Sequence, residues 1–211
     1  FNRNMTLVCL GQSLGYGASA FLAPLLPLYL VSQGHAEGFI GLVLAAFNVA
    51  SFISRPLWGA LCDRGYMRAG LTASGLLFGT AYAGYLVPGA VFIFLVRGIH
   101  GIAWGGVNVV GSAWMAILAP ANRRAEALGW YTMAQRLGTA VGPLSALWVM
   151  QNLGFSPAFM IGAAVAYLFS LSGVLTTSYS GRRTTATATG EKPSLIRSLI
   201  EPGALLGAAL V

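Results

Sequence analysis

Six long apolar segments set the strongest limit on what this chain can fold into. A helix that crosses a bilayer needs roughly 20 apolar residues at about 1.5 Å per residue. Such stretches follow one another, with short links, along most of the 211 residues. We therefore predict an all-α membrane protein with six spanning helices over residues 5–31, 39–62, 69–86, 91–118, 127–150 and 157–177.

Composition excludes a soluble protein. Charged residues make up 8% of the chain and hydrophobic residues 56%, whereas soluble domains carry about 25% charged residues. The net charge of +7 fits membrane topology better than a nucleic-acid partner, because most basic residues fall in predicted loops and tails. Cys9 and Cys62 have no metal-type spacing, so we expect neither a disulfide nor a metal or other cofactor.

The basic residues of the loops all fall on one predicted face of the membrane. They are Arg3, Arg64, Arg68, Arg123, Arg124, Arg182, Arg183, Lys192 and Arg197. The links on the opposite face contain no Lys or Arg. Because positive loops stay in the cytoplasm, we expect a multi-pass protein of the plasma membrane, the inner membrane of a bacterium, with a cytoplasmic N-terminus.

The chain divides into three parts by composition. Residues 1–178 hold the six predicted helices, and residues 179–201 read as a cytoplasmic linker with a short interfacial helix. Residues 202–211 begin a seventh apolar run. Because the first residue is Phe1 and this last run is short, we expect the chain to be the N-terminal part of a longer protein. A chain that exists alone, or that pairs with a second copy as a half-size transporter, stays an open alternative.

Glycines four residues apart predict close contacts between helices, since they let two backbones approach. Four pairs occur, although chance accounts for some of them in a chain with 28 glycines. They are Gly11/Gly15, Gly75/Gly79, Gly101/Gly105 and Gly138/Gly142.

The fourth segment carries polar side chains at Arg97, His100, Trp104 and Asn108. Spacings of three, four and four residues put them on one face of a helix. Polar groups inside a membrane are costly, so each is a candidate for a functional site. For each, a packing role competes: Arg97 could bond to carbonyls of neighbouring helices, His100 could be a hydrogen-bonded packing residue, and Trp104 could simply fill space.

Other segments add polar side chains that could meet this face. The fifth contributes Tyr131, Gln135 and Arg136, and the first contributes Gln12 and Tyr16, whose ring could serve either packing or ligand contact. The second contributes Asn48, Ser51 and, nearer the cytoplasm, Arg55. We predict that the first, second, fourth and fifth helices line a polar cavity that takes a small-molecule substrate.

Arg97 and Arg136 lie deep in their segments, yet the five acidic residues lie near or beyond helix ends. An unpaired buried cation is expensive. Three solutions stay open: a carboxylate from another part of the protein, backbone oxygens, or an anionic ligand.

Three local patterns resemble signatures of the major facilitator superfamily. Residues 59–68, from Gly59 to Arg68, resemble the Gly-x-Leu-x-Asp-Arg loop, with Tyr66 and Met67 as departures. Residues 97–101 resemble Arg-x-x-Gln-Gly, with His100 in place of Gln. Gly129, Gly138 and Gly142-Pro143 resemble the helix-five pattern of the antiporter branch, although Ala146 and Leu147 replace its later glycines.

The resemblance implies a fold of two six-helix halves, each made of two inverted three-helix repeats, with a midplane site between the halves. This chain would be the N-terminal half, and the absent C-terminal half its partner in the bilayer. By the same resemblance Gly59, Asp63, Arg64, Arg68, Arg124 and Glu126 would form a cytoplasmic gate. Gly129, Gly138, Gly142 and Pro143 would pack helix five at the interface between the halves.

The leading hypothesis is therefore a secondary active transporter that works by alternating access and exports a small organic molecule in exchange for protons, without a cofactor. The alternative is an importer or facilitator of a small metabolite or anion, favoured by the lack of an acid within the membrane. A membrane scaffold would have no need of buried arginines, and an enzyme would need a catalytic constellation that the sequence lacks.

Overall fold

The computed structural model describes residues 2–176, and these form six long helices without a strand. The helices are α1 (Arg3–Ser32), α2 (Glu37–Asp63), α3 (Met67–Gly84), α4 (Ala90–Leu118), α5 (Arg124–Leu153) and α6 (Phe155–Leu175), with a single 3₁₀ turn, η1 (Ala121–Arg123), before α5. The six predicted helices are confirmed, with ends that move by a few residues. The predicted linker and seventh helix lie outside the described residues.

The start of α6 differs from the expectation that Pro157 would be its first residue. Gly154, with φ of 87°, ends α5, and α6 begins at Phe155. Pro157 is therefore the third residue of α6. It is tolerated there because the first N–H groups of a helix have no partner within the helix.

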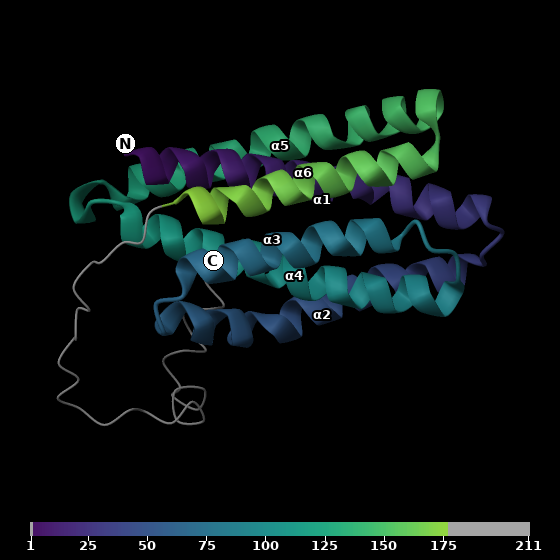
Figure 1. Ribbon diagram of the computed structural model, residues 1–211, viewed down its shortest axis with the longest axis horizontal. Coiled ribbons are helices and arrows are strands. Elements are labelled where there is room, and N and C mark those ends of the chain that lie inside the picture. The colour runs from purple at the N-terminus through teal and green to yellow at the C-terminus, as the bar shows by residue number, and fades with distance from the viewer. Residues whose placement is uncertain (1, 177–211) are drawn as a thin grey trace, which may run out of the picture. The chain divides into compact units, whose positions relative to one another are not determined.

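The helices pack as two related groups (Figure 1). α1 packs along α5 and also contacts α6, while α4 packs along α2 and also contacts α3. Contact between α3 and α6 joins the groups. Exchanging α1–α3 for α4–α6 reproduces the pattern of neighbours, as expected for two three-helix repeats.

Each predicted glycine pair lies at a helix–helix contact. A Cβ on Gly11 or Gly15 would meet α6, and one on Gly75 would lie 2.6 Å from the Cα of Ser170, also in α6. Gly101 and Gly105 face α2, and Gly138 and Gly142 face α1. The glycines thus let backbones touch at the contacts that hold the bundle together.

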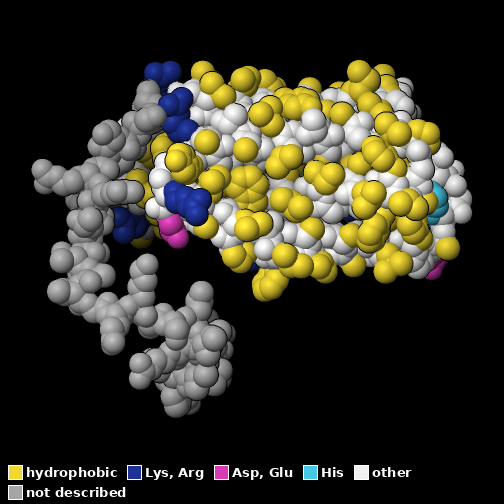
Figure 2. All heavy atoms as spheres, turned by 60° about the horizontal axis from the view of Figure 1, so that its bottom comes forward, with side chains coloured by type: hydrophobic (Ala, Val, Ile, Leu, Met, Phe, Trp, Pro, Cys, Tyr) yellow, Lys and Arg dark blue, Asp and Glu magenta, His cyan; other side chains and the backbone are white. Residues whose placement is uncertain are grey.

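The outside of the bundle suits lipid. Leu144 and Phe52 keep 74% and 71% of their surface exposed, and many other large apolar side chains are exposed as well. Figure 2 shows this apolar surface, with arginine side chains gathered at one end. Among the described helices, α1, α2, α4 and α6 are long and apolar enough to cross a membrane by themselves. α3 has only 18 residues and α5 carries more polar side chains, but both lie alongside the others.

Candidate functional site

A polar cavity of about 340 Å³ opens between the four helices that the sequence singled out. α1 contributes Tyr16, α2 contributes Arg55 and α5 contributes Tyr131 and Gln135. α4 lines it with Asn108, Val109 and Ser112. The volume falls within the usual range for small-molecule sites, about 300–1,000 Å³.

Several polar groups of the cavity wall are held by hydrogen bonds. The Tyr16 hydroxyl donates to Oδ1 of Asn108 at 2.5 Å, and Nδ2 of Asn108 donates to the Trp104 carbonyl at 2.8 Å. The Ser112 hydroxyl donates to carbonyls of its own helix. The rings of Tyr16 and Trp104 lie 4.7 Å apart. The wall is therefore preorganised, with Trp104 supporting it from behind.

Gln12 and Gln135 tie the cavity to the core. Gln12 is fully buried, and its Nε2 donates to the Val107 carbonyl at 3.1 Å. Its Oε1 accepts a weaker bond from Nε2 of Gln135 at 3.4 Å. One turn away, the Tyr131 side chain is 4% exposed, and its hydroxyl has no hydrogen-bond partner among residues 2–176. That hydroxyl is an available polar group beside the cavity.

Arg97 and His100 do not line this cavity. His100 is fully buried, with its ring 4.4 Å from the Phe78 ring and its Nδ1 3.0 Å from the Tyr85 hydroxyl. Arg97 is 8% exposed, and its guanidinium carbon lies 4.2 Å from the centre of the Phe47 ring. Nε of Arg97 and Nε2 of His100 have no partner within residues 2–176.

The predicted single stripe on α4 is thus divided by depth. The four residues share a helical face, but this face meets aromatic side chains of α2 and α3 near Arg97 and His100. Nearer the other end of α4 it opens on the cavity at Asn108. The spacing of residues along one helix determines which side chains point in the same direction. It does not show which neighbouring helix packs against each turn. Continuing the same spacing by four residues leads to Ser112, which the sequence reasoning missed.

Arg136 lies on α5 one residue beyond Gln135 and is exposed at the bundle surface. Gln135 lines the cavity together with Arg55 of α2, whereas Arg136 itself is not among the lining residues. The described acids stay at helix ends: Glu37 and Asp63 begin and end α2, and Glu126 is in the first turn of α5.

The residues expected to form a cytoplasmic gate lie at one end of the bundle. Gly59, Asp63 and Arg64 are at the end of α2, where Gly65, with φ of 84°, allows the chain to turn toward α3. Arg68 donates from Nη2 to the Val174 carbonyl at 2.9 Å and so binds the end of α6. The turn of this loop therefore forms despite Tyr66 and Met67.

Glu126, one of the expected gate residues, pairs with Arg123, which the sequence reasoning did not include among them. The Arg123 guanidinium donates two bonds of 2.7 Å to the carboxylate. These bonds hold the pKa of Glu126 below its ordinary value. The reason is local: Arg123 stands three residues before Glu126, in the turn that enters α5, where the two side chains face each other.

The helix-five glycines pack inside this bundle. A Cβ on Gly138 would lie 2.9 Å from the nitrogen of Gly17, and one on Gly142 would lie 2.7 Å from the Gly17 carbonyl oxygen. A Cβ on Gly129 would meet nothing within 4 Å among the described residues. Gly138 and Gly142 therefore join α5 to α1 within this bundle, and Pro143 follows them in α5. Their expected role at an interface between halves stays a prediction.

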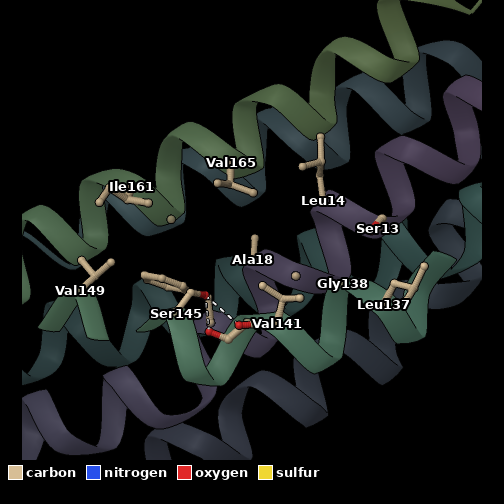
Figure 3. A pocket seen from close by; sticks show the side chains of 14 residues that line it. Ser13, Leu14, Ala18, Leu137, Gly138, Val141, Ser145, Val149, Ile161 and Val165 are labelled. Carbon is tan, nitrogen blue, oxygen red and sulfur yellow. Dashed lines mark hydrogen bonds between the residues drawn. The ribbon is translucent and has the colours of Figure 1, made fainter. Parts of the chain in front are cut away.

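An apolar groove of about 470 Å³ lies beside that contact, between α1, α5 and α6 (Figure 3). Val141, Val149, Ile161 and Val165 are among its lining residues. The hydroxyl of Ser145 donates to carbonyls of its own helix, at Val141 and Gly142. The groove offers little polar recognition and contrasts with the cavity.

Comparison with known proteins decides the family. The family model described as Major Facilitator Superfamily matches residues 8–211. The chain belongs to the major facilitator superfamily. The predicted family and the six-helix fold are therefore confirmed, and the chain is an integral, multi-pass membrane protein.

Curated relatives in this superfamily include transporters of two kinds. The chain is 30% identical to the staphyloferrin B transporter of Staphylococcus aureus over 180 residues, which cover 82% of the chain and 42% of that protein. It is 31% identical to the multidrug resistance protein MdtG of Yersinia enterocolitica over 173 residues, 79% of the chain and 42% of that protein. The chain thus spans about two fifths of the length of these relatives.

Proposed function

We propose that this chain is the N-terminal half of a secondary transporter that moves a small organic molecule across the bacterial inner membrane by alternating access. The observation that carries the proposal is the polar cavity among α1, α2, α4 and α5, inside a bundle whose outer surface is apolar. Polar groups within a membrane are retained where they serve a pathway. The named activities of the relatives support transport over a scaffold or an enzyme.

We propose export driven by a proton gradient as the direction and energy source, because relatives include multidrug resistance proteins. In this proposal the N-terminus lies in the cytoplasm, since the loop arginines gather at one end of the bundle. Gly59, Asp63, Arg64, Arg68, Arg124 and Glu126 belong to the gate at that end. One observation favours a facilitator or importer instead: no described acid lies in the middle of a helix.

Flux through proteoliposomes that contain the full-length gene product tests this proposal. We expect an imposed pH gradient to accelerate the movement of a fluorescent organic probe, and Tyr131→Phe to slow it without loss of protein. Flux that ignores the gradient would favour the facilitator. Protein that inserts and folds but moves no organic probe in either direction would contradict transport.

A further inference from the structure

The membrane-embedded part of the described structure is unbalanced in charge. Arg55 lies eight residues before the end of α2, or about 12 Å along the helix, and Arg136 lies twelve residues, or about 18 Å, into α5. Asp63 and Glu126 lie at the helix ends, and the ion pair found within residues 2–176 joins Arg123 to Glu126 at the bundle end. The deep arginines thus have no carboxylate from this part of the chain.

One of these arginines lines the cavity and the other lies next to a lining residue. Arg55 is part of its lining, and Arg136 directly follows the lining residue Gln135 in α5. Both side chains are exposed, so their guanidinium groups are open to a ligand. Arg97 differs, because it is buried against the Phe47 ring.

The neutral groups of the cavity add hydrogen-bond donors. Asn108 and Ser112 already donate to backbone carbonyls, and Gln135 donates to Gln12. The Tyr131 hydroxyl has no partner within residues 2–176, although it is almost fully buried. Asn108 and Gln135 each keep one amide N–H, and the groups that make no hydrogen bond within residues 2–176 are the two guanidinium groups and the Tyr131 hydroxyl.

From this donor set we propose that the cavity recognises its substrate through an anionic group, with a carboxylate as the closest match. This inference rests on the proposed transport function. A carboxylate accepts two parallel bonds from a guanidinium and a third from a hydroxyl. It also neutralises arginines that would otherwise stay unpaired in a medium of low dielectric. A cationic substrate would meet two like charges and no described carboxylate.

Two dyes with the same xanthene core separate these cases: carboxyfluorescein is anionic and rhodamine 6G is cationic. Their transport is measured in proteoliposomes of the full-length gene product, and their binding by fluorescence polarisation in detergent. We expect carboxyfluorescein to be preferred. Arg55→Gln and Arg136→Gln are each expected to weaken its apparent affinity about tenfold or more, since a charged hydrogen bond is lost.

Matched variants separate charge from folding. Arg55→Lys keeps the charge and is expected to retain more affinity for carboxyfluorescein than Arg55→Gln. Arg3→Gln removes an exposed charge at the bundle end and is expected to change the binding and transport of neither dye. The affinity for rhodamine 6G is expected to be unchanged or higher in the glutamine variants.

The outcomes distinguish the inference from the proposed function. A preference for rhodamine 6G, or wild-type affinity for carboxyfluorescein in both glutamine variants, would overturn the anionic site while leaving transport intact. Equal losses of affinity for both dyes in the glutamine variants would also overturn it. Such losses would show that the arginines have a structural role or pair with an acid from another part of the protein. Binding of carboxyfluorescein that depends on Arg55, without flux, would support the site and contradict transport. Failure to bind or move either dye would overturn the inference.

Discussion

Replacing Gly138 by alanine tests the contact of α1 with α5, which holds two walls of the cavity together. The added Cβ would lie 2.9 Å from the nitrogen of Gly17 and closer still to the carbonyl oxygen of Ser13. Ordinary contact begins at 3.4 Å, so the shortfall against the Gly17 nitrogen is 3.4 − 2.9 = 0.5 Å. Both neighbours are backbone atoms, so no side chain can turn aside and the helices must separate.

Overpacking of this kind costs about 1–3 kcal/mol. Alanine recovers up to about 1 kcal/mol through its better helix propensity. Because the contact with the Ser13 carbonyl oxygen is the tighter of the two, the cost lies at the upper end of this range, and we expect Gly138→Ala to lower the free energy of unfolding by about 2 kcal/mol. Gly129→Ala is the matched control, since its Cβ meets nothing within 4 Å among residues 2–176. It is expected to be neutral or slightly stabilising.

Thermal unfolding in detergent measures the difference, with a thiol-reactive dye that reports the exposure of the buried Cys62. In a protein of this size 1 kcal/mol corresponds to about 2–4 °C, so Gly138→Ala should melt several degrees below Gly129→Ala. Equal melting temperatures for the two variants, or a more stable Gly138→Ala, would refute the reasoning from backbone contact.

Three further predictions concern other parts of the bundle. His100→Ala should destabilise the protein by about 2–4 kcal/mol in the same melting assay, because it empties a buried site among aromatic rings and removes the hydrogen bond to the Tyr85 hydroxyl. His100→Gln should retain most of the stability, and equal melting of the two variants would contradict this. The pKa of Glu126 is lowered in the folded protein, so its stabilising effect should be complete above the ordinary pKa of 4.5 and fade as the pH falls through the lower folded pKa. Glu126→Gln should therefore melt at a lower temperature than wild type at pH 7 and at the same temperature at strongly acidic pH. A cysteine at Glu37 should react with an impermeant thiol reagent in intact cells, and one at Asn122 only in inside-out vesicles; the reverse would contradict the proposed orientation.

The sequence predicts the fold well because the bilayer allows few solutions. Apolar length determines the helices, and glycine spacing such as Gly101/Gly105 marks where backbones touch. The helix that composition describes least well is α5, where Gln135 and Arg136 lower the apolar content. Gln135 lies toward Gln12 and the cavity, whereas Arg136 is exposed at the bundle surface.

The candidate site is less predictable, since it depends on which neighbour covers each turn. The i, i+4 rule correctly aligned Arg97 with Asn108 along α4. It could not show that aromatic rings of α2 and α3 enclose the first and leave the second beside a cavity. Arg123 was missed as the partner of Glu126 because the 3₁₀ turn before α5 sets the direction of its side chain.

Reaction of introduced cysteines with a charged thiosulfonate tests most directly whether the polar cavity is the transport route. Ser112→Cys places the thiol on the cavity wall, and Ser145→Cys places it in the apolar groove; both serines bond only to their own helix. In a background without other cysteines, we predict that the reagent labels Ser112→Cys and stops flux in proteoliposomes, and that it leaves Ser145→Cys unlabelled and active. Labelling and inhibition at Ser145→Cys, with Ser112→Cys inert, would contradict the assignment of the cavity.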